Sequence, residues 1–252
     1  MNIALVTGAS SGLGEEFCHS LDAKGLDCIW MVARRAEALE RVADSLKTST
    51  KIIIADLSTK EGVGKVIDEL NEESPSIRYL INNAGFGLFG SSWEIPRQKT
   101  EEMISLNVTA LVSITSACIP HMSSGSKIIE ICSESAYVPL KDLAVYSSTK
   151  AFVRHYCDAL REELKDTGIT VTEVSPGWIR TDFIDICVND KNVPKKVFNH
   201  TVSREDVVCD AMRVADKGGK RSTCGLYTRI QIALSNHFRG LAIRVWNGSL
   251  KR

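Results

Sequence analysis

The chain begins with a short apolar run that leads directly into a glycine-rich turn. Ile3 to Thr7 has the composition of a strand buried on both faces of a parallel sheet. The turn that follows is Gly8-Ala9-Ser10-Ser11-Gly12-Leu13-Gly14, and a helical pattern then runs through Leu21 until Gly25. Glycines let a backbone approach a pyrophosphate closely, and a helix N-terminus offers it free N–H groups. The sequence therefore predicts a dinucleotide site here, the alternative being a tight strand-to-helix turn without a ligand.

Two arginines follow the second predicted strand, Asp27 to Val32. Arg34 and Arg35 stand about twenty residues beyond the glycines, where an NAD site places an acidic residue on the ribose hydroxyls. A guanidinium binds phosphate through its planar fork of N–H donors. The pair favours a cofactor with a 2′-phosphate, NADP(H). The alternative is a solvated pair at the start of the predicted helix Ala36 to Lys47.

The third predicted strand, Lys51 to Ile54, also ends near a polar residue. Asp56, with Leu57 beside it, is placed to accept a hydrogen bond from an adenine amino group. Ser58 is expected to cap a helix that continues to about Glu72.

The fourth predicted strand, Tyr79 to Asn82, is followed by Asn83, Ala84 and Gly85. Ligands of open parallel sheets bind outside the carboxyl ends of the strands, so this amide-rich segment is assigned to the same site.

A long helix is predicted from Thr100 to His121, and Asn107 lies within its apolar face. A buried amide needs hydrogen-bond partners. Asn107 is either a structural bridge between helix and strand or an anchor for a water molecule beside Lys150.

Tyr146 and Lys150 are four residues apart at the start of the predicted helix Val145 to Lys165. This spacing puts the phenol and the ammonium on one helix face. A nearby ammonium stabilises the phenolate, so Lys150 is expected to lower the pKa of Tyr146 and permit proton transfer near neutral pH. Ser133 follows the fifth predicted strand, Ser126 to Cys132, from which its hydroxyl can bind the same substrate oxygen.

The sixth predicted strand, Thr170 to Ser175, ends in Pro176-Gly177 and precedes a long apolar segment. Residues 178 to 200 show no regular periodicity, and an apolar loop of this length is typical of a lid or a substrate wall. The residues expected to form the substrate wall are Ser133, Ser135, Tyr137, Phe183 and Ile184, with Phe86, Phe89, Trp93 and Leu140 adding apolar surface.

The last part of the chain carries no negative charge. Residues 217 to 252 hold eight Lys or Arg and no Asp or Glu, which leaves residues 1 to 216 with 23 basic and 31 acidic side chains. Ser203 and Asp206 predict a helix start, and Leu226 to Thr228 is predicted as an edge strand. We expect this basic C-terminal segment to cap the substrate pocket or pack against another subunit. The alternative is an interfacial helix on anionic lipid.

Composition limits the class of protein. With 252 residues, 44% of them hydrophobic, and 31 basic side chains against 31 acidic ones, the chain predicts an ordinary globular protein without a nucleic-acid partner. The eight cysteines lack C-x-x-C or zinc spacing and the five histidines do not cluster, so we expect no metal and reduced thiols in the cytoplasm. No stretch was expected to reach the ~20 apolar residues of a membrane span.

Strands and helices alternate along the whole sequence, without repeats or a linker. This pattern predicts an α/β fold in a single domain over residues 1–252. We expect a Rossmann fold, that is, a doubly wound parallel sheet with helices on both faces.

Taken together, the motifs resemble the classical short-chain dehydrogenase/reductase family over nearly the whole chain. The T-G-x-x-x-G-x-G motif of the family is matched from Thr7 to Gly14, and its N-N-A-G motif from Asn82 to Gly85. Its Asn–Ser–Tyr–Lys tetrad falls on Asn107, Ser133, Tyr146 and Lys150. The cofactor-binding residues that the resemblance and the motifs imply are Gly8, Ser10, Ser11, Gly12, Leu13, Gly14, Arg34, Arg35, Asp56, Leu57, Asn83, Ala84, Gly85, Tyr146, Lys150, Pro176, Gly177, Ile179 and Thr181.

The resemblance implies hydride transfer between nicotinamide C4 and a carbonyl or secondary-alcohol carbon. Tyr146 would be the general acid/base, Ser133 would position the substrate oxygen, and Asn107 would hold a proton-relay water. Lys150 would lower the pKa of Tyr146 and hold the nicotinamide ribose. The family also implies a homodimer or homotetramer through the two long helices.

Two positions depart from the pattern of the family. Glu130 stands where the family usually has Asn, which could place a carboxylate close to the cofactor. Ser11 stands where many NADP-preferring relatives have a basic residue, so the cofactor prediction depends on Arg34 and Arg35 alone.

Three functions remain open. The first is an NADP(H)-dependent oxidoreductase of lipid metabolism that interconverts a bulky apolar ketone and a secondary alcohol, such as a hydroxysteroid. The second is a reductase of 3-oxoacyl thioesters on an acyl carrier protein, which a basic face would serve. The third is a non-catalytic dinucleotide-binding sensor that docks through the basic C-terminal segment. The intact tetrad argues against this third function.

Overall fold

The computed structural model describes residues 1–181, 183–188 and 193–250. Residues 182 and 189–192 of the predicted loop, and 251–252 of the basic segment, lie outside the described residues.

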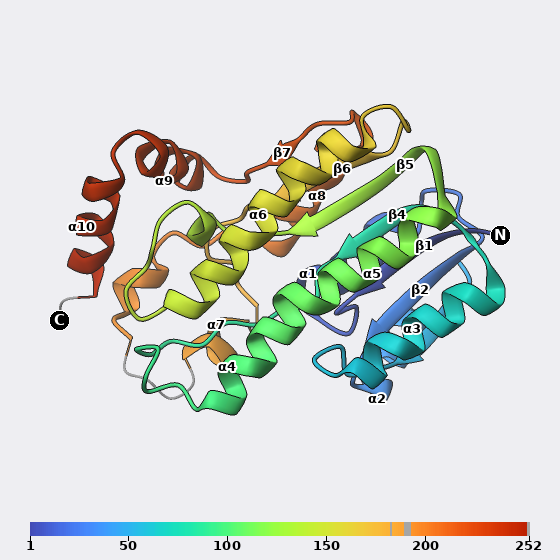
Figure 1. Cartoon of the computed structure of the whole chain (residues 1–252), viewed down its shortest axis with the longest axis horizontal. Coiled ribbons are helices and arrows are strands. Elements are labelled where there is room, and N and C mark those ends of the chain that lie inside the picture. Colours follow the sequence, from blue (N-terminus) through green and yellow to red (C-terminus); the bar gives the residue numbers. More distant parts are fainter. Residues whose placement is uncertain (182, 189–192, 251–252) are drawn as a thin grey trace.

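The described strands form one sheet in which all pairs are parallel (Figure 1). Their order is β3-β2-β1-β4-β5-β6-β7. The strands are β1 Asn2–Thr7, β2 Cys28–Ala33, β3 Thr50–Ile54, β4 Ser76–Asn82, β5 Met122–Ile131, β6 Thr170–Val174 and β7 Arg221–Ser222. The strand order reverses between β1 and β4, which creates a crevice at the carboxyl ends of these strands. The predicted doubly wound parallel sheet is confirmed.

Helices cover both faces of the sheet. They are α1 Gly12–Leu21, α2 Ala36–Asp44, α3 Lys60–Glu73, α4 Arg97–Ile104, α5 Leu111–Cys118, α6 Ala144–Leu164, α7 Phe183–Val188, α8 Arg204–Asp216, α9 Leu226–His237 and α10 Arg239–Ser249. Shorter turns are the π-helix η1 Ser105–Ala110 and the 3-10 helices η2 Ile119–His121, η3 Glu134–Ala136 and η4 Lys195–Phe198. Side chains of α3, α5 and α6 pack on one face and those of α1, α2 and α8 on the other.

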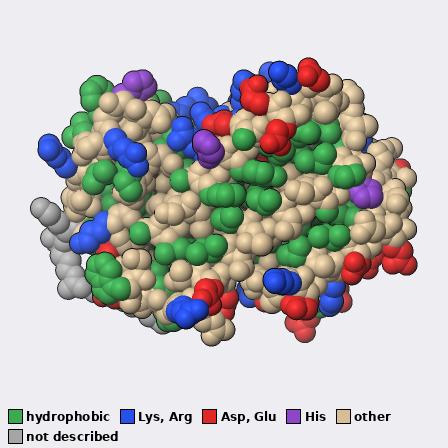
Figure 2. Space-filling model, viewed as in Figure 1, with side chains coloured by type: hydrophobic (Ala, Val, Ile, Leu, Met, Phe, Trp, Pro, Cys, Tyr) green, Lys and Arg blue, Asp and Glu red, His purple; other side chains and the backbone are tan. Residues whose placement is uncertain are grey.

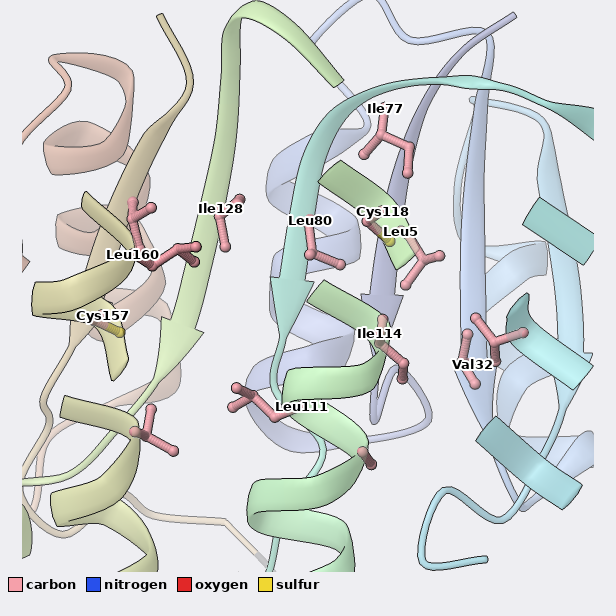
Figure 3. Packing of buried hydrophobic residues seen from close by; sticks show 14 of the residues in the cluster. Leu5, Val32, Ile77, Leu80, Leu111, Ile114, Cys118, Ile128, Cys157 and Leu160 are labelled. Carbon is pink, nitrogen blue, oxygen red and sulfur yellow. The ribbon is translucent and has the colours of Figure 1, made fainter. Parts of the chain in front are cut away.

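The strands are apolar because both of their faces are buried. Leu80 of β4 faces α3, α5 and α6, whereas its neighbour Ile81 faces α1, α2 and α8. Figure 3 shows Leu80 and Ile128 of the sheet opposite Ile114 of α5 and Leu160 of α6. This two-sided core fixes the edge at which the strands end.

The helical stretch Arg97–His121 is long and apolar enough, by length and composition, to cross a membrane. Part of this stretch is buried: Met103, Ile114 and Cys118 are at most 1% exposed, and the last two pack against the sheet. The apolar window of the stretch is 39% buried, so packing accounts for part of its apolar composition.

Several local predictions are corrected. Leu226–Thr228 is the first turn of α9, and the edge strand is Arg221–Ser222. Thr59, not Ser58, caps α3: its hydroxyl accepts a hydrogen bond from Gly62 N–H at 3.0 Å. The predicted loop 178–200 contains the helical segments α7 and η4. The predicted start of α8 is confirmed, since Ser203 accepts a hydrogen bond from Asp206 N–H.

Candidate active site

A cavity of about 410 Å³ opens at the carboxyl edge of the sheet. The loops that follow β1 to β6 all contribute to its lining. Every predicted cofactor-binding residue except Gly14 lines it, as do Ser133, Ser135 and Phe183. Side chains far apart in the sequence are thus brought to one site, as the sequence predicted.

The glycine turn is packed too tightly for side chains. Gly8 has a φ of +66°, and a Cβ there would lie 2.7 Å from Asn83 Nδ2. A Cβ on Gly14 would lie 2.1 Å from the Gly8 carbonyl oxygen. Gly14 therefore lets α1 pack against the turn and does not line the cavity. The bare backbone of this turn fits the close approach of a pyrophosphate.

The two arginines lie at the glycine-turn end of the cavity. Arg35 Nη2 donates to Ser11 Oγ at 3.0 Å and to Ser10 Oγ at 3.4 Å. Arg34 Nη1 lies 3.8 Å from Asp56 Oδ2, and its side chain is 73% exposed. The donors of Arg35 and the two hydroxyls form a set that suits a phosphate group, whereas Arg34 is partly neutralised by Asp56.

Ser133, Tyr146 and Lys150 converge on the cavity from β5 and α6. The Ser133 hydroxyl accepts a hydrogen bond from Ser135 N–H at 3.1 Å and lies near enough to the Tyr146 hydroxyl to lower the pKa of that phenol. Lys150 Nζ donates to the Ile131 carbonyl at 2.6 Å and lies 5.9 Å from the centre of the Tyr146 ring. The Phe183 ring of α7 covers Tyr146, with ring centres 5.7 Å apart. A hydroxyl, a phenol and an ammonium are therefore held together beside apolar walls.

The expected effect of Lys150 on Tyr146 is wrong for this arrangement. Burial raises the pKa of Tyr146, and the nearby Ser133 hydroxyl only partly opposes this effect. Burial also lowers the pKa of Lys150, and its ammonium is directed to the Ile131 carbonyl. The phenol of Tyr146 consequently stays protonated at neutral pH.

Asn107 lies behind the cavity and does not line it. Its Oδ1 accepts from Phe86 N–H at 3.0 Å, and its Nδ2 donates to the Phe86 carbonyl at 2.8 Å and to Thr149 Oγ1 at 3.1 Å. The π-helical turn η1 directs the amide to this position. Asn107 thus joins the segment after β4 to α6, and its Oδ1 keeps a second lone pair that can accept a hydrogen bond from a water molecule, so this position is compatible with both roles that the sequence left open.

Glu130 does not lie beside the predicted cofactor site. It is fully buried against α5, where Oε1 accepts from Asn82 Nδ2 and Thr115 Oγ1, each at 3.0 Å. Its Oε2 has no hydrogen-bond partner among the described residues. Burial raises the pKa of Glu130 to about 7, against the opposing effects of these hydrogen bonds and of Lys150.

Part of the predicted substrate wall is also corrected. Tyr137 points into the core and donates its hydroxyl to Glu173 Oε1 at 2.6 Å, between the guanidinium groups of Arg154 and Arg221. Ile184 does not line the cavity, whereas Ile186 does. Trp93 is 84% exposed. The direction of a side chain in an irregular segment depends on contacts that periodicity does not report.

Several lining residues were not predicted, among them Leu106, Glu134 and Leu143. For the last two the available signal was their place in the chain, since Glu134 directly follows Ser133 and Leu143 precedes Tyr146 by three residues. The described residues hold no group of three or more His, Cys, Asp or Glu that could bind a metal ion.

The basic C-terminal segment packs beside the site. Trp246 of α10 donates its indole N–H to the Lys141 carbonyl at 3.0 Å and stacks on Phe89 at 6.2 Å. Thr228 of α9 approaches Gly177, where a Cβ would lie 2.7 Å from its hydroxyl. The helices α9 and α10 lie at the end of the molecule towards which β4 and β5 point (Figure 1). None of their described residues lines the main cavity, so the capping role stays a prediction.

Comparison with known proteins gives a consistent result. Residues 2–191 match the family model described as short chain dehydrogenase. An uncharacterised oxidoreductase of Staphylococcus epidermidis is 31% identical over 71% of this chain and 78% of the relative.

Two solved structures are also similar. A short-chain dehydrogenase of Sphingobium yanoikuyae in complex with NADPH has 27% identity and a TM-score of 0.79, covering 96% of this chain and 95% of that one. A bulky-bulky ketone specific alcohol dehydrogenase of Comamonas testosteroni has 26% identity and a TM-score of 0.77, covering 96% and 93%.

The buried carboxyl of Glu130 should make stability depend on pH. The folded protein keeps this proton up to a pKa of about 7, whereas the ordinary value is 4.5, so stability falls as the pH rises through this window. We expect Glu130→Gln to exceed the wild type by about 1–3 kcal/mol in free energy of unfolding at pH 8 and to match it near pH 5. Urea unfolding at both pH values measures this, with the exposed Glu61→Gln as control. A less stable variant at pH 8 would mean that the ionised carboxylate is net stabilising.

Proposed function

The chain belongs to the short-chain dehydrogenase family, and on this premise we propose that it interconverts a ketone and a secondary alcohol by hydride transfer with NADP(H). One observation carries the proposal: Ser133, Tyr146 and Lys150 line the same cavity as the glycine turn. A binding module that only senses a dinucleotide has no need of a serine, a tyrosine and a lysine together beside that turn.

The residues support the following roles. NADP(H) would supply or accept the hydride at its nicotinamide ring. In ketone reduction, Tyr146 donates its proton to the carbonyl oxygen, and Ser133 donates a hydrogen bond to the same oxygen. Burial raises the pKa of Tyr146, so the phenol holds the proton that this step requires.

Lys150 and Asn107 act around these two residues. Lys150 would hold the nicotinamide ribose, since its ammonium lies on the cavity side of Ile131. A Cβ on Gly85 would lie 2.9 Å from Asn107 Oδ1 and 3.6 Å from Lys150 Nζ, so both side chains lie close to Gly85. Here we assign Asn107 the role of holding a proton-relay water.

We assign NADP(H) over NAD(H) because Arg35 joins Ser10 and Ser11 at the end of the cavity. The relative with NADPH bound agrees with this choice. Asp56 and Leu57, from the loop after β3, would flank the adenine.

The substrate class follows from the walls. Leu140, Leu143, Trp178, Phe183 and Ile186 give the cavity a largely apolar lining. A bulky apolar ketone, of which a hydroxysteroid is one example, fits such walls. The similarity to a dehydrogenase of bulky ketones supports this class.

The second candidate, a reductase of 3-oxoacyl thioesters, is favoured by the cationic C-terminal segment. Free thiols at all eight cysteines accord with a cytoplasmic site of action.

Replacing Tyr146 by Phe should abolish turnover. Removing the proton donor is expected to lower kcat by at least ~100-fold while the cofactor still binds. The assay follows NADPH oxidation with a panel of bulky ketones and acetoacetyl thioesters, and NADP+ reduction with hydroxysteroids. Cofactor binding is measured by NADPH fluorescence. Ser148→Ala, at an exposed position on the same helix, is the control. Undiminished turnover in Tyr146→Phe would contradict the proposed role of Tyr146. A wild-type activity on thioesters far above that on ketones would favour the second candidate function.

Arg35→Leu tests the cofactor assignment. We expect the KM for NADP+ to rise about 10- to 100-fold, because a charge-assisted phosphate contact is lost, with little change for NAD+. Arg34→Leu is the matched control and should have a smaller effect, since Asp56 already pairs with Arg34. A wild type that prefers NAD+ would contradict the assignment.

Two faces are proposed as contact surfaces. Ile104 and Phe152 are 44% and 45% exposed on the face of α4 to α6, where Figure 2 shows hydrophobic side chains gathered, and we assign a homodimer or homotetramer to this face. Phe238 and Leu241 lie 65% and 49% exposed among the arginines of α9 and α10, and an anionic membrane suits that surface.

Light scattering of the wild type should give a particle mass of two or four times the chain mass of 27.7 kDa, and Phe152→Glu should give the mass of a single chain. A monomeric wild type would contradict the proposed oligomer surface.

Phe238→Glu should leave the particle mass unchanged but weaken the sedimentation of the protein with anionic vesicles relative to neutral ones. Equal sedimentation of the wild type with both vesicle types would contradict the proposed membrane surface.

A further inference from the structure

Glu134 is a partly buried carboxylate that the proposed hydride transfer does not use. It follows Ser133 directly, and its backbone N–H donates to the Pro176 carbonyl at 3.0 Å. Its side chain lines the main cavity and also a second cavity of about 80 Å³ beneath α9 and α10. Its Oε2 is buried and receives no hydrogen bond from the described residues. Glu134 thus stands where the two cavities meet, and no described residue donates a hydrogen bond to its Oε2, which lies beside Gly177.

The protein supplies no counter-charge to this carboxylate in the part of the chain that the structure describes. The second cavity is lined there by neither Lys nor Arg. Glu173, which is fully buried, is by contrast paired with Arg221 at 3.0 Å and accepts a hydrogen bond from the hydroxyl of Tyr137. Burial alone raises the pKa of Glu134 to about 7, with no neighbouring cation to lower it. An unpaired buried carboxylate is costly, so a ligand that brings a positive charge would relieve this cost.

Aromatic rings form part of the wall of this second cavity, among small and aliphatic side chains. Trp178, Tyr227 and Trp246 line it, and His200 stacks on Tyr227 with ring centres 4.0 Å apart. The faces of such rings attract organic cations. A carboxylate above aromatic walls is suited to an alkylammonium group, and it would repel an anionic substituent.

We propose that Glu134 is a specificity-determining residue that pairs with a protonated amine on the substrate, and that the second cavity holds this amine. The proposal deepens the proposed function and rests on it. With the reacting carbonyl at Ser133 and Tyr146, the part of the substrate that passes Ser135 enters the junction at Glu134. The substrate class is therefore an apolar ketone or secondary alcohol that carries a basic amine.

Two ketones that have the same shape but differ in charge test the proposal. One ends in a dimethylamino group and the other in an isopropyl group at the same position, and kcat/KM is measured with NADPH for the wild type and Glu134→Gln. We expect the wild type to prefer the amine by at least about 10-fold, as for a desolvated charge pair. In Glu134→Gln this ratio should fall to about 1, and Glu134→Asp should keep part of it. A change in folding alone would not alter the ratio.

Equal ratios in the wild type and Glu134→Gln would overturn the proposal and leave the reductase activity intact. If neither ketone is reduced, the proposed function is what fails. Isothermal titration calorimetry of both ketones with the NADP+-saturated protein then decides the amine site separately. Tighter binding of the amine to the wild type but not to Glu134→Gln supports the site, and equal affinities overturn it.

Discussion

The carboxyl edge of the sheet depends on a few hydrogen bonds that join β1 to the segment after β4. Thr7 Oγ1 accepts from the N–H groups of Asn83 and Ala84, both at 3.0 Å. Asn83 Nδ2 donates in return to the carbonyls of Thr7 and Gly8, at 3.0 and 3.2 Å. These bonds lie where the strand order reverses, and parallel strands would otherwise separate there. They hold the glycine turn and the segment at Gly85 on one side of the crevice, so every later contact of the site builds on them.

Burial, more than the neighbouring charges, determines the protonation of the groups around this edge. It raises the pKa of Tyr146 and lowers that of Lys150, so both favour their neutral forms relative to ordinary values. The same effect acts on Glu130 and Glu134, whose carboxyl pKa values each rise to about 7. A phenol kept protonated is a competent proton donor to a carbonyl oxygen. The reverse reaction requires the phenolate, and a bound cofactor with its positive nicotinamide would help to stabilise that form.

The repeating features of the sequence predicted the fold and the cofactor end of the site. Buried parallel strands are nearly continuous apolar runs, and each is followed by small or polar residues that the topology brings to one edge. Single side chains in irregular segments were less predictable. Tyr137 is of a residue type that is common in substrate walls, yet its hydroxyl donates a hydrogen bond to Glu173 within the core. Glu130 lies on a predicted strand, but one of its hydrogen-bond donors, Thr115, belongs to a helix, and the sequence did not predict this contact. Leu226 to Thr228 is too short for its period to distinguish a strand from the first turn of α9.

The two ends of the cavity differ in charge, and this difference bears on the choice between candidate functions. Arg34 and Arg35 make the glycine-turn end basic, whereas Glu134 makes the end beneath α9 and α10 acidic. In the proposed function, this difference would favour binding of a 2′-phosphate at the glycine-turn end, with the nicotinamide end towards Tyr146. A 3-oxoacyl thioester carries its phosphate on the arm that leads away from the reacting carbon, and an arm directed into the second cavity would meet Glu134. The cations of α9 and α10 that would serve an acidic carrier lie on the outer surface, among exposed apolar side chains (Figure 2). The charge inside the cavity thus favours a ketone of neutral or cationic character over an anionic thioester.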